Sequence, residues 1–316
     1  VSGPWRLTVW DSPAPVGGGK MYVFSEEHAN TGSCPQSRHF SSLAAEVLQK
    51  TRGVHVLMEN FVHANDVQIP KTGRNTSLAQ ACSPVNEGIL NNLRDCLEVM
   101  KINSQYCPGG CDKRIHFIDP RVDMVSVLPD GKLFQAISHY VNHKASQGLF
   151  DEALLTIFEA IVHPLSSLLP DRRNLVGRLV GAFDAFRARM SPPQRETFDK
   201  IWVGDITGGI VDLNAKYVKL HHAYSSSSKK RPPLSRFSKD VEDMKTTYKR
   251  YTNKFMDIWL LAHVFMIQNT TGSSGMVMYL GSLHGLQIEK YFVAHGLRKI
   301  YHSDNQNLKS CLSLSK

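Results

Sequence analysis

Four short, largely apolar runs along the chain each end in polar residues, and they predict four buried strands. The runs are Met21–Phe24, Val54–Met58, Arg114–Ile118 and Met276–Leu280. Their length and the turn residues around them are typical of strands covered on both faces. Between the first three runs, apolar positions recur at helical spacing over residues 40–51 and 84–100. Strands that alternate with helices in this way predict a parallel sheet with right-handed crossovers.

The hydrophobic pattern changes between the third and fourth strands. From about residue 133 to 268 it is helical, interrupted by a Ser-, Lys- and Pro-rich segment that is typical of an exposed loop. We therefore predict an α/β fold with a mostly parallel sheet flanked by helices and a large helical insertion before the last strand. Residues 1–130 form the N-terminal part of the α/β domain, and residues 131–270 form the insertion, with the basic loop near 225–240. Residues 271–316 supply the C-terminal strand and helix that complete the α/β domain.

Polar residues with catalytic potential follow each predicted strand. His28, Glu59, the pair Asp119 and Arg121, and His284 come after the first, second, third and fourth strands respectively. In open parallel α/β sheets, ligands bind beyond the carboxyl ends of the strands. We therefore expect these residues to meet at one edge of the sheet.

Two chemistries fit this set of side chains. His28, Glu59 and His284 could hold a divalent metal ion with open positions, which would activate a bound water. Without a metal, Glu59 could act as general base, with a histidine as acid and Arg121 stabilising an anion. A third alternative is a hydrogen-bonded structural network in which Arg121 pairs with a carboxylate. No Gly-x-Ser-x-Gly, P-loop or Gly-x-Gly-x-x-Gly motif follows a strand, which disfavours serine hydrolases, NTPases and dinucleotide-binding proteins.

The net charge and the cysteine content give expectations about binding partners and about the cellular compartment. The formal net charge of +9 favours acidic or anionic partners, and part of the excess lies in Lys229, Lys230 and Arg231. No sequence-specific nucleic-acid motif accompanies these cations, and no apolar run reaches the length of a transmembrane helix. The chain starts without a signal peptide, so we expect its six cysteines to be reduced and the protein not to be secreted.

The strand-end motifs resemble those of a largely uncharacterised protein family of nucleocytoplasmic large DNA viruses. That family pairs a strand-Gly-Asp-x-His start with a strand-end Glu, Arg-x-His-Tyr-x-Asp-x-Arg and a late Tyr-x-Gly-x-x-His. The matching segments here are Val23–His28, Leu57–Glu59, Arg114–Arg121 and Tyr279–His284, with Met256–Trp259 similar to a helical Met-Asp-x-Tyr segment. Ser25 and Glu26 replace the family's Gly-Asp. The layout is also similar, more loosely, to erythromycin-esterase-like and TraB-type metallohydrolases.

This resemblance implies a protein of a large DNA virus built on a hydrolase-like fold, and the composition of the chain would suit an iridovirus. The expected function is a virion-associated, minor capsid or capsid-linked component, with capsid proteins or other virion components as partners. The alternative is an active metal-assisted hydrolase, with Glu59, Asp119, Arg121 and His116 as catalytic residues and a divalent metal on His28, Glu59 and His284. In either case we expect the protein in the host cytoplasm at the virus assembly site, and in the virion if it is packaged.

Overall fold

The chain forms two compact units in the computed structural model. The first consists of Val1–Asp119 and His263–Lys316, and the second of Pro120–Ala262. The structure describes residues 6–11, 19–26, 39–61, 77–83, 89–107, 109–119, 183–225, 238–271 and 275–304. His28, Arg121 and the three cations Lys229, Lys230 and Arg231 lie outside these residues.

A six-stranded sheet is the centre of the first unit. Its strands are β1 (Arg6–Asp11), β2 (Lys20–Glu26), β3 (Val54–Phe61), β4 (Ile115–Asp119), β5 (Gly275–Gly281) and β6 (Arg298–Asp304). They are ordered β4-β3-β5-β2-β1-β6 across the sheet. The pairs β4–β3, β3–β5 and β5–β2 are parallel. Strand β1 runs antiparallel to both β2 and β6.

The prediction of an α/β fold is confirmed, whereas the prediction of a mostly parallel sheet is wrong because the sheet is mixed. The four predicted strands form the parallel part, and the two strands that the sequence pattern missed, β1 and β6, add the antiparallel pairings. Strand β1 is joined to β2 by the short Pro- and Gly-rich connection of residues 12–19, which suits an antiparallel pair. Strand β6 is an exposed edge strand rich in polar residues, so it lacks an apolar run.

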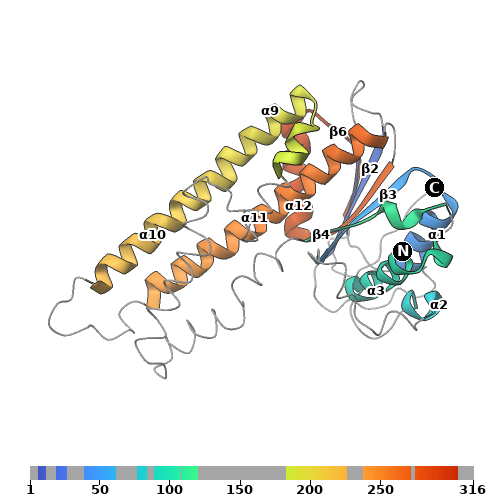
Figure 1. Ribbon diagram of the computed structural model, residues 1–316, viewed down its shortest axis with the longest axis horizontal. Helices are drawn as coiled ribbons and strands as arrows, with labels where there is room; N and C mark the ends of the chain where they lie inside the picture. Colours follow the sequence, from blue (N-terminus) through green and yellow to red (C-terminus); the bar gives the residue numbers. More distant parts are fainter. Residues whose placement is uncertain are drawn as a thin grey trace. The chain divides into compact units, whose positions relative to one another are not determined.

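Helices cover both faces of the sheet (Figure 1). On one face lie α1 (Phe40–Lys50), α2 (Leu78–Ala81) and α3 (Ile89–Ile102). They close a core with β2, β3 and β5. In it the ring of Phe40 packs at a tilt between those of Phe24 and Tyr279, with 4.7 Å between the centroids of each pair. The other face carries α12 (Ser282–Ala294) and the end of α11 (Ser238–Thr271). Gln268 of α11 lies against Met21, and Phe292 of α12 packs on Trp10.

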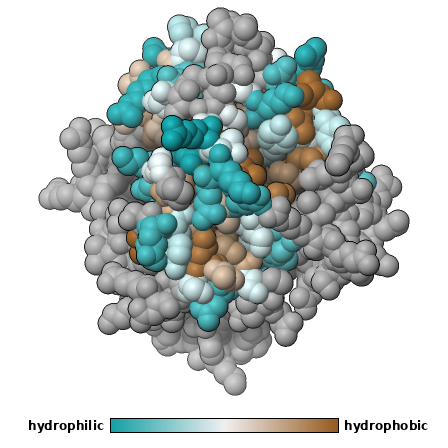
Figure 2. Space-filling view, turned by 90° about the vertical axis from the view of Figure 1, so that its right-hand side faces the viewer, coloured by the Kyte–Doolittle hydropathy of each residue, from teal (hydrophilic) through white to brown (hydrophobic). Residues whose placement is uncertain are grey.

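Two disulfides tie the helical layer around α3 together. Cys82, after α2, is bonded to Cys96 in α3, and Cys107 is bonded to Cys111 across a turn with left-handed glycines at 109 and 110. The expectation of reduced thiols is therefore wrong for these four residues. Packing of α2 against α3 brings Cys82 and Cys96 together, which their spacing in the sequence does not show. Figure 2 views the molecule from the side of α1–α3, where hydrophilic and hydrophobic side chains are intermixed.

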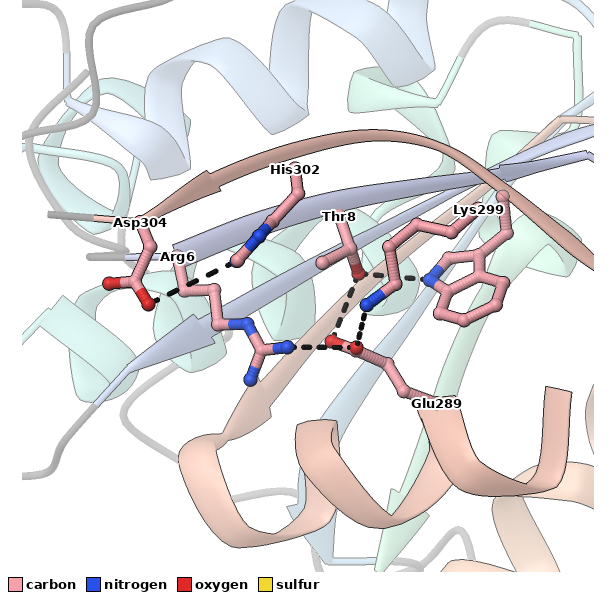
Figure 3. Close-up of polar contacts among 7 residues, drawn as sticks. Arg6, Thr8, Glu289, Lys299, His302 and Asp304 are labelled. Atoms are coloured by element: carbon pink, nitrogen blue, oxygen red, sulfur yellow. Dashed lines mark hydrogen bonds and ion pairs between the residues drawn. The ribbon is translucent and has the colours of Figure 1, made fainter. Parts of the chain in front are cut away.

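A buried ion network fixes α12 to the antiparallel edge of the sheet (Figure 3). The carboxylate of Glu289 accepts hydrogen bonds from Arg6 of β1 at 2.8 Å, Lys299 of β6 at 3.0 Å and Thr8 of β1 at 3.1 Å. Trp10 extends the network, because its indole N–H donates to Thr8 and the Lys299 ammonium lies 4.9 Å from its ring centroid. These contacts set the position of the helix whose first turn carries His284.

The described part of the second unit is helical. It contains α9 (Pro192–Ile201), a π-helical segment (Trp202–Thr207), α10 (Gly208–Ser225) and the first part of α11. Phe183 packs edge-on against Trp202, Phe255 and Trp259, which joins these elements through an aromatic core. All of them fall between β4 and β5 in the sequence. Within the described residues, no helix combines the length and hydrophobicity needed to cross a membrane.

Candidate functional site

The carboxyl ends of β2, β5 and β3 lie side by side and carry several buried polar groups. Glu26 of β2 is the register partner of Gly281 of β5, and Met58 of β3 is the partner of Tyr279 of β5. Glu59 therefore lies beside the end of β5. Glu59 and Glu26 are each only 3% exposed. Because burying a carboxylate is costly without partners, their contacts indicate what these positions do.

Glu59 connects β3 to the start of α12. Its Oε2 accepts a hydrogen bond of 2.7 Å from the backbone N–H of Gly281, and its Oε1 lies 3.9 Å from Nε2 of His284. Gly281 is both the last residue of β5 and the N-cap of α12, so no loop separates strand from helix. A carboxylate at this point also faces the positive end of the helix dipole. The structure thus brings together two of the predicted site residues, Glu59 and His284.

Glu26 has a different partner on the opposite face of the sheet. The Tyr279 hydroxyl donates a 2.5 Å hydrogen bond to its Oε2. Burial, followed by the charge of Glu26 and this hydrogen bond, raises the pKa of Tyr279 well above its usual value. The phenol consequently stays protonated and acts as a donor. Because side chains alternate along a strand, Glu26 lies on the α1 face with Phe24, whereas Glu59 faces α12.

Ser25 brings α12 close to the sheet at the same edge. Its side chain is fully buried, and its Oγ has no hydrogen-bond partner among the described residues. A Cβ added at Gly285 of α12 would overlap Ser25 Oγ and would lie 3.2 Å from Ser25 Cβ. The absence of a side chain at position 285 makes room for Ser25. Helix α12, and with it His284, packs directly on the end of β2.

The remaining described site residues lie on β4. Asp119 is fully buried at the end of the strand, where its register partner is Phe61. Strand alternation directs Asp119 toward the side of Ile115 and Phe117, which pack in the core with α1 and α3. His116 points to the α12 face, as Glu59 does, but its register partner is Leu57, two residues before Glu59. The association of Asp119 and His116 with the Glu59–His284 pair stays a prediction, as do the roles of His28 and Arg121, which lie outside the described residues.

His116 belongs to a histidine cluster that the sequence pattern did not reveal. Its Nε2 lies 2.9 Å from Nδ1 of His55 at the start of β3, and the two rings stack with centroids 5.2 Å apart. The ring of His263, on α11, approaches His116 edge-on at 6.3 Å. Burial, and then the positive potential of His263, His55 and Lys101, lowers the pKa of His116 to about 3. His55 and His116 each lie in a predicted strand, but the pairing of these two strands and the contact of His263 are decided by the tertiary structure.

The prediction of a divalent metal ion on His28, Glu59 and His284 stays a prediction. Glu59 and His284 supply two donor atoms 3.9 Å apart, and Gly281 N–H already occupies the second oxygen of Glu59. Among the described residues, no group of three or more His, Cys, Asp or Glu is arranged to hold a metal ion. The third predicted ligand, His28, is outside those residues.

Comparisons with protein-family models, with curated proteins and with solved structures find no match to this chain. The resemblance to the viral family and to TraB-type metallohydrolases consequently stays a hypothesis. It rests on the motifs at the strand ends.

Proposed function

We propose that the protein is a hydrolase in which Glu59 acts as the general base and His284 as the general acid. The observation that carries the proposal is the Glu59–His284 pair, placed where β3 and β5 end and α12 begins. Functional groups in parallel α/β sheets are found at this edge, because loops and helix N-termini present polar groups there. The four predicted strand ends include both members of the pair.

The geometry assigns different tasks to the two oxygens of Glu59. Oε2 is held by Gly281 N–H, which fixes the orientation of the carboxylate, and Oε1 faces His284. At 3.9 Å, Oε1 and Nε2 are too far apart for a direct hydrogen bond, but one water about 2.8 Å from each atom could bridge them. Glu59 would accept a proton from that water as it attacks an ester or phosphoester. His284 would donate a proton to the leaving oxygen.

The first test is hydrolysis of p-nitrophenyl acetate and bis-p-nitrophenyl phosphate by wild type and by Glu59→Gln. The substitution keeps the shape of the side chain and an acceptor for Gly281 N–H but removes the base. We expect turnover to fall by about 10²-fold or more. The control is Glu46→Gln, the same substitution at a carboxylate that pairs with Lys50 on the surface of α1, which should keep its turnover.

The assays are run with EDTA and with added Mg²⁺, Mn²⁺ or Zn²⁺ to test the predicted divalent metal. A rate that depends on the added ion would support His28 as a third ligand beside Glu59 and His284. If Glu59→Gln hydrolyses both compounds as fast as wild type but unfolds more easily, the pair belongs to a structural network and the proposal is wrong. A virion-associated role is an independent prediction from the motif resemblance, and detection of the chain in purified particles would test it.

A further inference from the structure

Three imidazoles from separate elements meet on the α11 face of the sheet. His55 comes from the start of β3, His116 from β4 and His263 from α11, and all three belong to the first unit. His55 is buried, whereas His116 and His263 are half-buried. The 2.9 Å contact between His55 Nδ1 and His116 Nε2 requires one nitrogen to donate and the other to accept. Both rings cannot be protonated while this hydrogen bond exists.

The electrostatic surroundings of the cluster disfavour added positive charge. Burial is the main cause of the lowered pKa of His55, and the positive charge of Arg114, just before β4, lowers it further. The charge of Lys101 in α3 contributes in the same way to the low pKa of His116. Strand β5 places the uncharged side chain of Met276 at the position paired with His55. The carboxylates on the strands themselves, Glu59 and Asp119, lie farther along, toward the strand ends.

Helix α11 contributes one imidazole, His263, to the cluster. Between Ile258 and Thr271 its sequence has no Asp, Glu, Lys or Arg, so His263 is the ionisable side chain of this stretch. A fourth imidazole, His295 at the end of α12, packs on Phe265 of α11 with centroids 4.7 Å apart, and burial lowers its pKa as well. The end of α11 thus contacts the rings of His116 and His295, whose pKa values are lowered by burial.

We propose that His55, His116 and His263 form an acid-sensitive clasp, which holds residues 263–271 of α11 on the sheet at neutral pH and releases them on acidification. In the closed state at least one imidazole of the cluster must be neutral. In the released state each ring faces water and regains an ordinary pKa near 6.5. Acid therefore favours the released state, and release uncovers the face of the sheet on which Glu59 and His284 lie.

The sign and steepness of the response follow from proton linkage. A histidine whose pKa is lower in the closed state than in the released state binds a proton on release. Below pH 6.5 the ratio of released to closed molecules then rises about tenfold per pH unit for each such histidine. For His116 this increase continues down to about pH 3.

Hydrogen–deuterium exchange of the full chain at pH 7.5, 6.5, 5.5 and 5.0, corrected for the intrinsic exchange rate, tests the clasp. We expect protection of residues 263–271 to fall by about tenfold or more between pH 6.5 and 5.5, while α1 (Phe40–Lys50) keeps its protection. His263→Gln removes the proton site on α11 and should reduce this pH response. The matched control, His302→Gln on the exposed strand β6, should leave it unchanged.

Two results with the wild-type protein alone would contradict the proposal. One is protection of residues 263–271 that does not change between pH 7.5 and 5.0, and the other is an equal loss in α1, which indicates general unfolding. An NMR titration of the wild-type imidazoles gives a second measurement. His116 should stay neutral well below pH 6.5 in the closed protein, so titration of its ring near pH 6.5 while α11 remains protected would contradict the proposal.

Discussion

Glu289 is the side chain whose replacement should most clearly weaken the first unit. Glu289→Gln keeps the shape of the side chain but removes the charge that faces Arg6, Thr8 and Lys299. Arg6 and Glu289 have side chains 9% and 7% exposed, so Arg6 would be left buried without its counter-ion. Breaking one partner of such a buried pair costs about 3–5 kcal/mol. Lys299 is 37% exposed and can return to water, so it adds little to the loss.

Urea unfolding followed by circular dichroism measures this loss as a lower transition midpoint at an unchanged m-value. Glu46→Gln is the matched control. Glu46 pairs with Lys50 on the surface of α1 at 2.7 Å, and the Lys50 side chain is 74% exposed. Such a pair contributes less than about 0.5 kcal/mol. Both substitutions replace Glu by Gln, so the difference between their losses in unfolding free energy measures the effect of burial.

A double-mutant cycle provides the refutation. Arg6→Met removes the buried cation, so Glu289→Gln should cost much less in that background than in wild type. We expect a coupling free energy of about 2 kcal/mol or more between the two positions. Additive losses, or a Glu289→Gln loss as small as that of Glu46→Gln, would show that water reaches the network and that the argument from burial is wrong.

Three further predictions concern packing, pH and the disulfides. Gly285→Ala should destabilise the protein by about 1–3 kcal/mol in urea, because the new Cβ overlaps Ser25 Oγ, and Ser25→Gly should relieve part of that loss if the overlap is its cause. The pKa of His116 is about 3 in the folded chain and 6.5 when unfolded, so the unfolded state binds more protons between these values. Unfolding free energy should therefore fall as pH decreases from about 6.5 toward 3, by up to about 1.4 kcal/mol per unit, and His116→Gln should flatten the curve. Reduction of the Cys82–Cys96 bond, with a sequence separation of 14, should lower the free energy of unfolding by about 3 kcal/mol, checked by thiol counting and urea melts; an unchanged midpoint would contradict it.

The sequence alone determined the parallel part of the sheet and the place of the candidate site. Short apolar runs revealed β2, β3, β4 and β5 because strands covered on both faces need apolar residues at nearly every position. The polar residue that follows each run then indicated the edge where Glu59 and His284 meet. These are local signals, since both the run and its end lie within a few consecutive residues.

Only the tertiary structure decided the features that depend on contacts between distant segments. Strand β6 is polar and exposed and forms by pairing with β1, so hydrophobic pattern does not mark it. The disulfide between Cys82 and Cys96 depends on the packing of α2 against α3, and the histidine cluster depends on where α11 crosses the sheet. The low pKa of His116 and the buried ion pairs of Glu289 depend on helices and strands that are far away in the chain. Burial by such distant neighbours cannot be predicted from a local pattern of residues.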